Sequence, residues 1–73
     1  MIDLRNAKPG DKLISRGGRT LTYVAYDPSA AFWPHYLHYD DTIEIVTTTR
    51  TDDGHFDDAL RKSDWDIVEI IPQ

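Results

Sequence analysis

The chain has 73 residues, of which 40% are hydrophobic and 29% are charged, and it contains no cysteine. This length suffices for one small domain over residues 1–73 and excludes a cofactor domain beside a catalytic one. The lack of cysteine excludes disulfides and thiolate metal sites and is typical of a reducing compartment. No apolar run approaches the roughly 20 residues that span a bilayer, and the N-terminus has no signal-peptide pattern. We therefore expect a cytoplasmic protein with no membrane partner.

Charge is distributed unevenly along the chain, whose net charge is −5. Residues 1–37 carry five basic and three acidic side chains, a balance of +2, whereas residues 38–73 carry three basic and ten acidic ones, a balance of −7. The acidic balance argues against sequence-independent DNA binding, because lysine and arginine must displace counterions from the phosphates. The second half leaves an acidic inhibitor that mimics DNA open, although its charge is low for imitating a duplex.

Turn residues divide the first third of the chain into two strands. The turn Lys8-Pro9-Gly10-Asp11 precedes a strand predicted over residues 11–15. The segment Arg16-Gly17-Gly18-Arg19 predicts a hairpin, because tight hairpin turns need the positive φ that glycine adopts. Residues 20–26 are rich in β-branched and aromatic side chains and predict the second strand. In a regular strand Leu21, Tyr23 and Ala25 share one face, while Thr20, Thr22, Val24 and Tyr26 share the other.

The middle of the chain predicts two further strands joined by a short turn. Residues 27–34 form a loop, and a third strand follows over residues 35–39. Asp40-Asp41 makes a polar turn, and the fourth strand is predicted over residues 42–50. Alternation places Leu37 and Tyr39 on a core face, and it places Ile43, Ile45 and Thr47 together on one face of the fourth strand. Val46 breaks the alternation there and indicates a bulge.

The last third predicts one helical turn and a closing strand. Asp-Gly at the centre of residues 51–56 indicates a second tight turn. Residues 57–62 can form one short helical turn, with acidic residues at its start and basic residues at its end. Residues 66–71 predict the fifth strand, which Pro72 ends. Five short strands between Gly, Pro and Asp turns predict an all-β fold, either a small barrel or a strongly bent antiparallel sheet.

The sequence offers no constellation for a metal, a cofactor or catalysis. His35 and His38 point to opposite faces of a strand, so they make a poor metal pair. An EF-hand loop centred on Gly54 would place Leu60 where the bidentate Glu is needed. The three serines lie in or beside turns and not in a nucleophile elbow. We therefore expect no cofactor, no metal and no enzymatic activity.

An aromatic stretch over residues 32–39 is the strongest candidate for a contact surface. It holds four of the eight Phe, Trp and Tyr residues of the chain. Aromatic side chains on loops of small barrels commonly contact peptides or unstacked bases. The candidate partner-binding residues here are Phe32, Trp33, His35 and Tyr36. The alternative is that Phe32 and Trp33 cap one open end of the core.

Arg16 and Arg19, which flank the glycine hairpin, complete the candidate contact residues. Paired arginines at a hairpin tip can grip an anion, although such side chains are commonly just solvated. Two functions other than DNA mimicry remain open from the residues. The first is a non-enzymatic module that binds a protein through the aromatic loop. The second is a binder of a small anionic ligand or single-stranded nucleic acid. A small core also makes a homo-oligomer possible.

Five short segments resemble a group of small uncharacterised proteins that tailed phages and prophages encode. They are Lys8-Pro9-Gly10-Asp11, Arg16-Gly17-Gly18-Arg19, Pro34-His35-Tyr36, the turn at residues 51–56 and Asp64-Trp65-Asp66-Ile67-Val68. The chain departs from the pattern in having His55 where arginine is favoured and a longer loop around Trp33. The resemblance implies an SH3-like barrel, a binding role and a phage-infected bacterial cell. The family has no assigned activity, so the resemblance carries over no catalytic residue.

Overall fold

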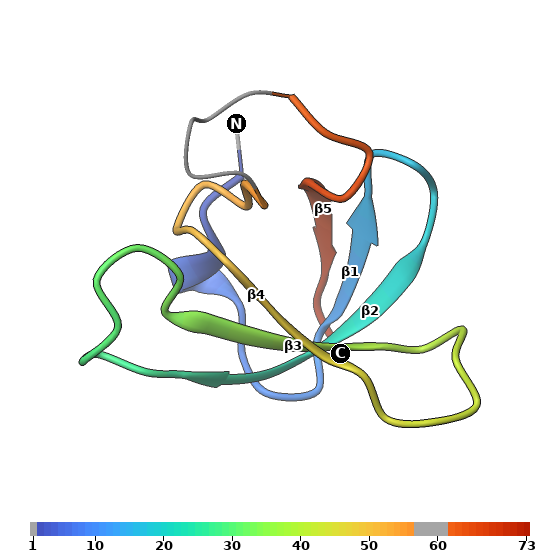
Figure 1. Cartoon of the computed structure of the whole chain (residues 1–73), viewed down its shortest axis with the longest axis horizontal. Coiled ribbons are helices and arrows are strands. Elements are labelled where there is room, and N and C mark those ends of the chain that lie inside the picture. The colour runs from blue at the N-terminus through green and yellow to red at the C-terminus, as the bar shows by residue number, and fades with distance from the viewer. Residues whose placement is uncertain (1, 57–61) are drawn as a thin grey trace.

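One antiparallel sheet of five strands organises the chain (Figure 1). The computed structural model describes residues 2–56 and 62–73. The strands are β1 (Lys12–Ser15), β2 (Thr20–Tyr26), β3 (His35–Tyr39), β4 (Thr47–Arg50) and β5 (Ile67–Ile71), and their order in the sheet is β4-β3-β2-β1-β5. The predicted helical turn at residues 57–62 falls mainly on residues 57–61, which lie outside the described part. No helix within the described residues is both long and apolar enough to cross a membrane.

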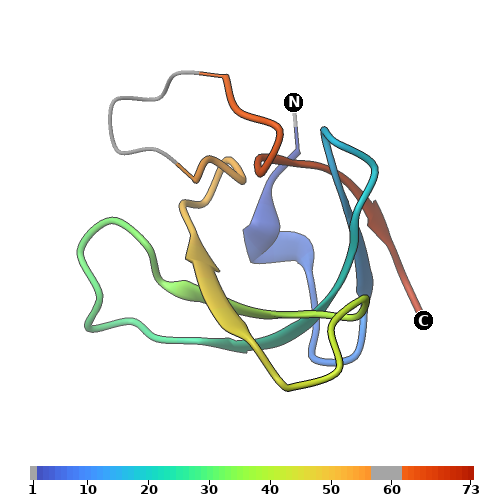
Figure 2. The ribbon, with the colours of Figure 1, turned by 45° about the vertical axis from the view of Figure 1, so that its right-hand side comes forward.

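The sheet is strongly bent but open, because β4 and β5 occupy its two edges (Figure 2). The all-β prediction is confirmed, and of its two forms the bent sheet is the one present. Side chains and loops connect the edges in place of strand pairing. The Ile67 amide donates to the Gly54 carbonyl at 2.8 Å, and Arg50 Nε donates to the Trp65 carbonyl at 3.0 Å.

The core lies on the concave side of the sheet and includes one residue from the N-terminal segment. Its buried apolar members are Leu4, Leu13, Leu21, Tyr23, Leu37 and Ile67. Leu4 begins the 3-10 turn η1 (Leu4–Asn6), which Asp3 caps by accepting a hydrogen bond from the Arg5 amide. The Leu4 amide donates to the Asp52 carbonyl at 2.7 Å, so η1 is attached to the end of β4. The predicted core position is confirmed for Leu37, while Tyr39 is only partly buried and packs against the core. In β2 the face shared by Leu21 and Tyr23 is the buried one.

The fourth strand is shorter than its sequence predicts. It begins at Thr47, and residues 42–46 form a loop in which Ile45 is 79% exposed. Strand β3 ends at Tyr39, whose amide donates to the Val46 carbonyl at 3.2 Å. Residues 42–45 lie beyond that bond, and none of the strands in the described part of the chain pairs with them, so their alternating pattern does not produce a strand. The prediction of a strand over residues 42–46 is therefore wrong.

A register shift between Tyr23 and Ala25 divides β2 where it pairs with β3. Tyr23 lies opposite Leu37, but Ala25 lies opposite Tyr36, so one extra residue is present on the β2 side. A bulge of this kind reverses the alternation beyond it. It brings Tyr26 to the face that Tyr23 occupies, and both rings contact His35, with centroids 5.2 Å and 5.7 Å away.

Candidate functional site

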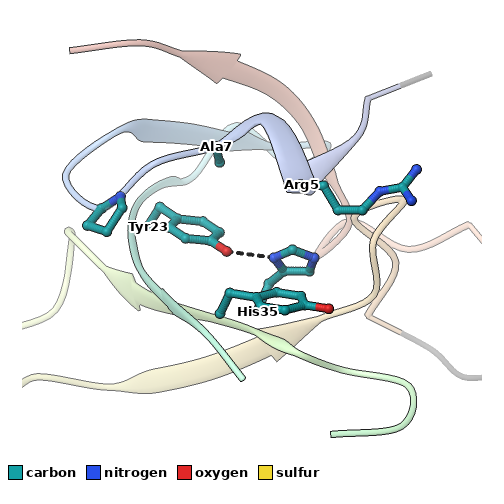
Figure 3. Close-up of a pocket in the computed structure, with 6 residues that line it drawn as sticks. Arg5, Ala7, Tyr23 and His35 are labelled. Carbon is teal, nitrogen blue, oxygen red and sulfur yellow. Dashed lines mark hydrogen bonds between the residues drawn. The ribbon is translucent and has the colours of Figure 1, made fainter. Parts of the chain in front are cut away.

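A pocket of about 500 Å³ opens where the 27–34 loop leaves the sheet (Figure 3). It is lined by Arg5, Ala7, Pro9, Tyr23, Tyr26 and His35. Tyr26 and His35 are paired in the sheet and stand immediately before and after the loop, so the loop and the pocket form one surface. This volume lies within the range of about 300–1,000 Å³ that is typical of ligand sites.

A chain of two hydrogen bonds fixes the floor of the pocket. The Tyr23 hydroxyl and His35 Nδ1 are 2.7 Å apart, and His35 Nε2 and Asp52 Oδ1 are also 2.7 Å apart. A carboxylate can only accept, so the Nε2 proton belongs to His35 and Nδ1 accepts from the Tyr23 hydroxyl. The His35 side chain is fully buried. Two aromatic rings are thereby held in fixed positions.

Tyr23 remains protonated in this arrangement. Burial raises the pKa of its hydroxyl, and the nearby Tyr26 and Asp52 raise it further. Desolvation and neighbouring negative charge both disfavour a phenolate. Tyr23 therefore serves as a hydrogen-bond donor and as an aromatic wall near neutral pH.

The rim of the pocket carries an ion pair between Arg5 and Asp3. Arg5 Nε donates to Asp3 Oδ1 at 2.9 Å, and Arg5 Nη2 donates to Asp3 Oδ2 at 2.9 Å. These bonds lower the pKa of the Asp3 carboxyl and raise that of the Arg5 guanidinium. The charge of Arg5 is therefore matched within the chain, although Arg5 stands at the pocket (Figure 3).

The predicted aromatic contact residues are divided between two surfaces. His35 lies in the pocket floor, and Phe32 is exposed in the adjoining loop, with its ring 5.9 Å from that of Trp33. Trp33 is half-buried, and its Nε1 donates to the Phe56 carbonyl at 3.2 Å. Tyr36 alternates away from His35, and its hydroxyl donates to Asp27 Oδ2 at 3.2 Å.

The two predicted arginines do not form a joint anion site. Arg19 donates to both carboxylate oxygens of Asp41, at 2.9 and 2.8 Å. Its guanidinium also lies over the rings of Tyr39 and Trp65, 4.4 and 5.0 Å from their centroids. Arg16 lies elsewhere, with its Nη2 3.7 Å from Asp66 Oδ2. An anion at Arg19 would have to displace Asp41.

A second cavity, of about 290 Å³, has Arg16 in its wall. It is lined by Ile2, Arg16, Asp53, His55, Lys62, Asp66, Ile67 and Val68. The buried Asp66 accepts hydrogen bonds from the Phe56 and Ser63 amides, each at 3.0 Å, and Arg16 and His55 are near its Oδ2. Burial raises its pKa, but these donors and His55 together lower it below the ordinary value. Asp66 thus ties the segments before and after residues 57–61 together.

Sequence reasoning missed most of the pocket. Tyr23 and Tyr26 belong to opposite faces of a regular strand, and no residue type at Val24 signals the bulge that unites them. The sequence pattern places Asp52 in a turn and gives no sign that its carboxylate is the partner of His35. His35 is therefore the one predicted contact residue among the six that line the pocket.

Neither a metal-binding arrangement nor a similarity to known proteins assigns a function to this site. In the described residues, no group of three or more His, Asp or Glu side chains is arranged to hold a metal ion. Comparison with protein-family models, with curated proteins and with solved structures finds no match to the chain.

Proposed function

We propose that this protein is a non-enzymatic binding module that holds a segment of a partner protein in the pocket and against the adjoining 27–34 loop. The observation that carries the proposal is the aromatic pocket of about 500 Å³ in which the Tyr23–His35–Asp52 chain fixes the rings of Tyr23 and His35. A contact surface that is rigid before binding loses less conformational entropy on association. Such a site suits recognition of a side chain.

The exposure of two aromatic side chains beside this pocket supports a protein partner. Tyr26 is 53% exposed and Phe32 is 68% exposed. Aromatic residues are enriched at the centres of protein interfaces, where they provide large contact area with few rotatable bonds. The 27–34 loop, green in Figure 2, projects from the same end of the sheet. A partner segment could therefore contact the pocket and Phe32 together.

The resemblance to small tailed-phage and prophage proteins supports a location for this activity. On that basis the module acts in the cytoplasm of a bacterial host and binds a host or phage protein. The anionic-ligand alternative has less support, because the two arginines have different partners. Arg19 forms an ion pair with Asp41, and Arg16 forms one with Asp66.

Selection from a random-peptide library against the full chain tests the proposal. We expect enriched peptides whose affinity falls by about tenfold or more in Tyr26→Ala and in Phe32→Ala, as for central interface aromatics. Ile43→Ala is the matched control, since Ile43 is fully exposed in the loop at the other end of β3. Enriched peptides that bind both aromatic variants as tightly as the parent protein, or a selection with no enrichment, would contradict the proposal.

A further inference from the structure

The pocket combines apolar walls with a fixed carboxylate beside its floor. Asp52 accepts at Oδ1 from His35 Nε2, and its carbonyl accepts from the Leu4 amide, both at 2.7 Å. Its side chain is nevertheless 45% exposed. Among residues 2–56 and 62–73, no hydrogen bond engages Asp52 Oδ2. One carboxylate oxygen is therefore held in place with its lone pairs available.

The charge balance around this carboxylate is negative. The carboxylates of Asp3, Asp52 and Asp53 all raise the pKa of the single guanidinium of Arg5, and Asp3 has the largest effect. Asp3 is bonded to Arg5 at this rim and Asp52 is bonded to the pocket residue His35, whereas Asp53 lines the second cavity, in a chain of net charge −5. Lys8 stands between the lining residues Ala7 and Pro9 and adds a positive charge there, so a bound cation is best placed on the His35 side, where Asp52 is bonded. Opposite charge favours a cationic guest there.

A guest that satisfies both features needs an apolar stem and a positive tip. Arginine and lysine side chains have this form, because their methylene stems pack on apolar surface while the charged group reaches a polar partner. Tyr26 is 53% exposed, and an aromatic ring attracts a cation over its face. Arginine is favoured over lysine, since its planar guanidinium stacks on aromatic rings and is less strongly hydrated.

We infer that the pocket recognises an arginine, or less favourably a lysine, in a basic segment of the partner protein, with Tyr26 as the platform and Asp52 Oδ2 as the acceptor. The inference rests on the proposed function, whose partner it specifies. In this arrangement the methylene stem of the arginine packs against the apolar walls of the pocket, and its positive charge lies at the carboxylate of Asp52. An acidic partner segment is disfavoured at the same rim.

Titration with capped tripeptides, monitored residue by residue by amide NMR of the full chain at low ionic strength, tests this inference. The probes are acetyl-Gly-Arg-Gly-amide and the same peptide with lysine, glutamate or citrulline, the last being the neutral isostere of arginine. We expect the arginine peptide to shift the Tyr23, Tyr26 and His35 signals and to bind about tenfold more tightly than the citrulline peptide. Equal binding of arginine and citrulline peptides, or no shift at these residues, would overturn it.

Charge variants give the test a second, independent arm. Asp52→Asn keeps an oxygen that can accept from His35 but removes the negative charge, so it should weaken arginine binding. Glu69→Gln removes the same charge from an exposed residue of β5 and should change binding less. Arg5→Gln removes a positive charge from the rim and should strengthen binding. Asp52→Asn and Glu69→Gln with equal effects, or weaker binding in Arg5→Gln, would contradict the assignment.

The two proposals fail in different ways. Library peptides that depend on Tyr26 and Phe32 but bind through apolar or acidic side chains would leave the binding module standing and refute the basic guest. Library peptides that ignore those residues would refute the proposed function itself. A tripeptide that binds at the pocket through arginine would still establish the cation site separately.

Discussion

His35 takes part in two hydrogen bonds whose directions fix the position of its proton. Nε2 donates to Asp52 and Nδ1 accepts from Tyr23, so both ring nitrogens have a partner within the chain. The sequence singled out His35 as a contact residue and excluded it from a metal pair with His38. It did not indicate that the ring is fully buried, because burial depends on η1 and on the turn after β4. Those two segments meet through the Leu4 amide and the Asp52 carbonyl.

Removal of the Tyr23 hydroxyl tests the buried hydrogen-bond chain. In Tyr23→Phe the buried Nδ1 loses its donor, so we expect the free energy of unfolding to fall by about 1–3 kcal/mol. Urea denaturation followed by fluorescence measures it. Tyr26→Phe is the matched control, because no hydrogen bond of the Tyr26 hydroxyl occurs within the described residues, and we expect a change within about 0.5 kcal/mol. Equal losses in the two variants would refute the chain.

The lowered pKa of Asp66 leads us to expect that the free energy of unfolding depends on pH. Its folded pKa is lowered, because the Phe56 and Ser63 amides and His55 together outweigh the opposing effect of burial. A carboxyl with a lowered folded pKa stabilises the protein above its unfolded value, and this contribution is lost as pH falls through the folded value. The loss from Asp66 should therefore occur mainly below the ordinary value of 3.8.

Asp66→Asn should be less stable than the parent at neutral pH and should show a flatter loss of stability on acidification. The measurement is the urea midpoint at a series of values between about pH 7 and pH 2, which covers the range of carboxyl titration. Asp64→Asn, in an exposed residue two positions away, is the control and should keep the parent profile. A profile for Asp66→Asn as steep as that of the parent would contradict the role of this carboxylate.

At the scale of elements, turn residues and alternation predicted where four of the five strands lie to within a residue. They could not predict the length of β4, because a strand needs a partner as well as β-forming residues. The loop at residues 40–46 has the alternation of a strand, yet β3 ends before it. The bulge in β2 also escaped prediction, since alternation assumes a regular strand. It is this irregularity that places Tyr26 in the pocket.

The exposed loop after β3 yields a test at this scale. Ile43→Ser combined with Ile45→Ser should change the free energy of unfolding by no more than about 0.5 kcal/mol per site, because both side chains are exposed. If they belonged to a core face, the loss would resemble the about 2–5 kcal/mol of buried Leu or Ile truncation. Leu37→Ala, in a fully buried residue of β3, is the comparison. Thermal and urea unfolding distinguish the two outcomes.

At the scale of the whole molecule, Arg50 connects the two edges of the open sheet. Its side chain is fully buried, and its guanidinium donates to Trp65, Thr48, Thr49 and Tyr39 while lying 4.9 Å from the centroid of the Phe56 ring. The strand and turn pattern predicted an all-β fold, and the chain length predicted a core of limited size. It did not indicate that an arginine would join β4 to the chain before β5, because nothing in the local pattern marks Arg50 as buried.

Arg50→Lys should therefore be costly despite the retained charge. Lysine lacks the planar fork that reaches several acceptors, and hydrogen bonds to charged groups contribute about 1.5–3 kcal/mol each, so we expect a loss of at least about 2 kcal/mol. Faster hydrogen exchange of the Ile67 amide should accompany it, because that amide joins the edges at Gly54. Arg5→Lys, at an ion pair in which the Arg5 side chain is 65% exposed, should have a much smaller effect. Comparable losses in the two variants would argue against a connecting role for Arg50.

The central claim is that the pocket beside Tyr26 is the contact face of this protein. The most direct test is to map the changes in amide chemical shift of the full chain when a library peptide binds. We expect the largest shifts at Tyr23, Tyr26, His35 and Phe32, with little change in the 40–46 loop or in β5. Shifts concentrated in the 40–46 loop or in β5, with the pocket unaffected, would contradict the assignment.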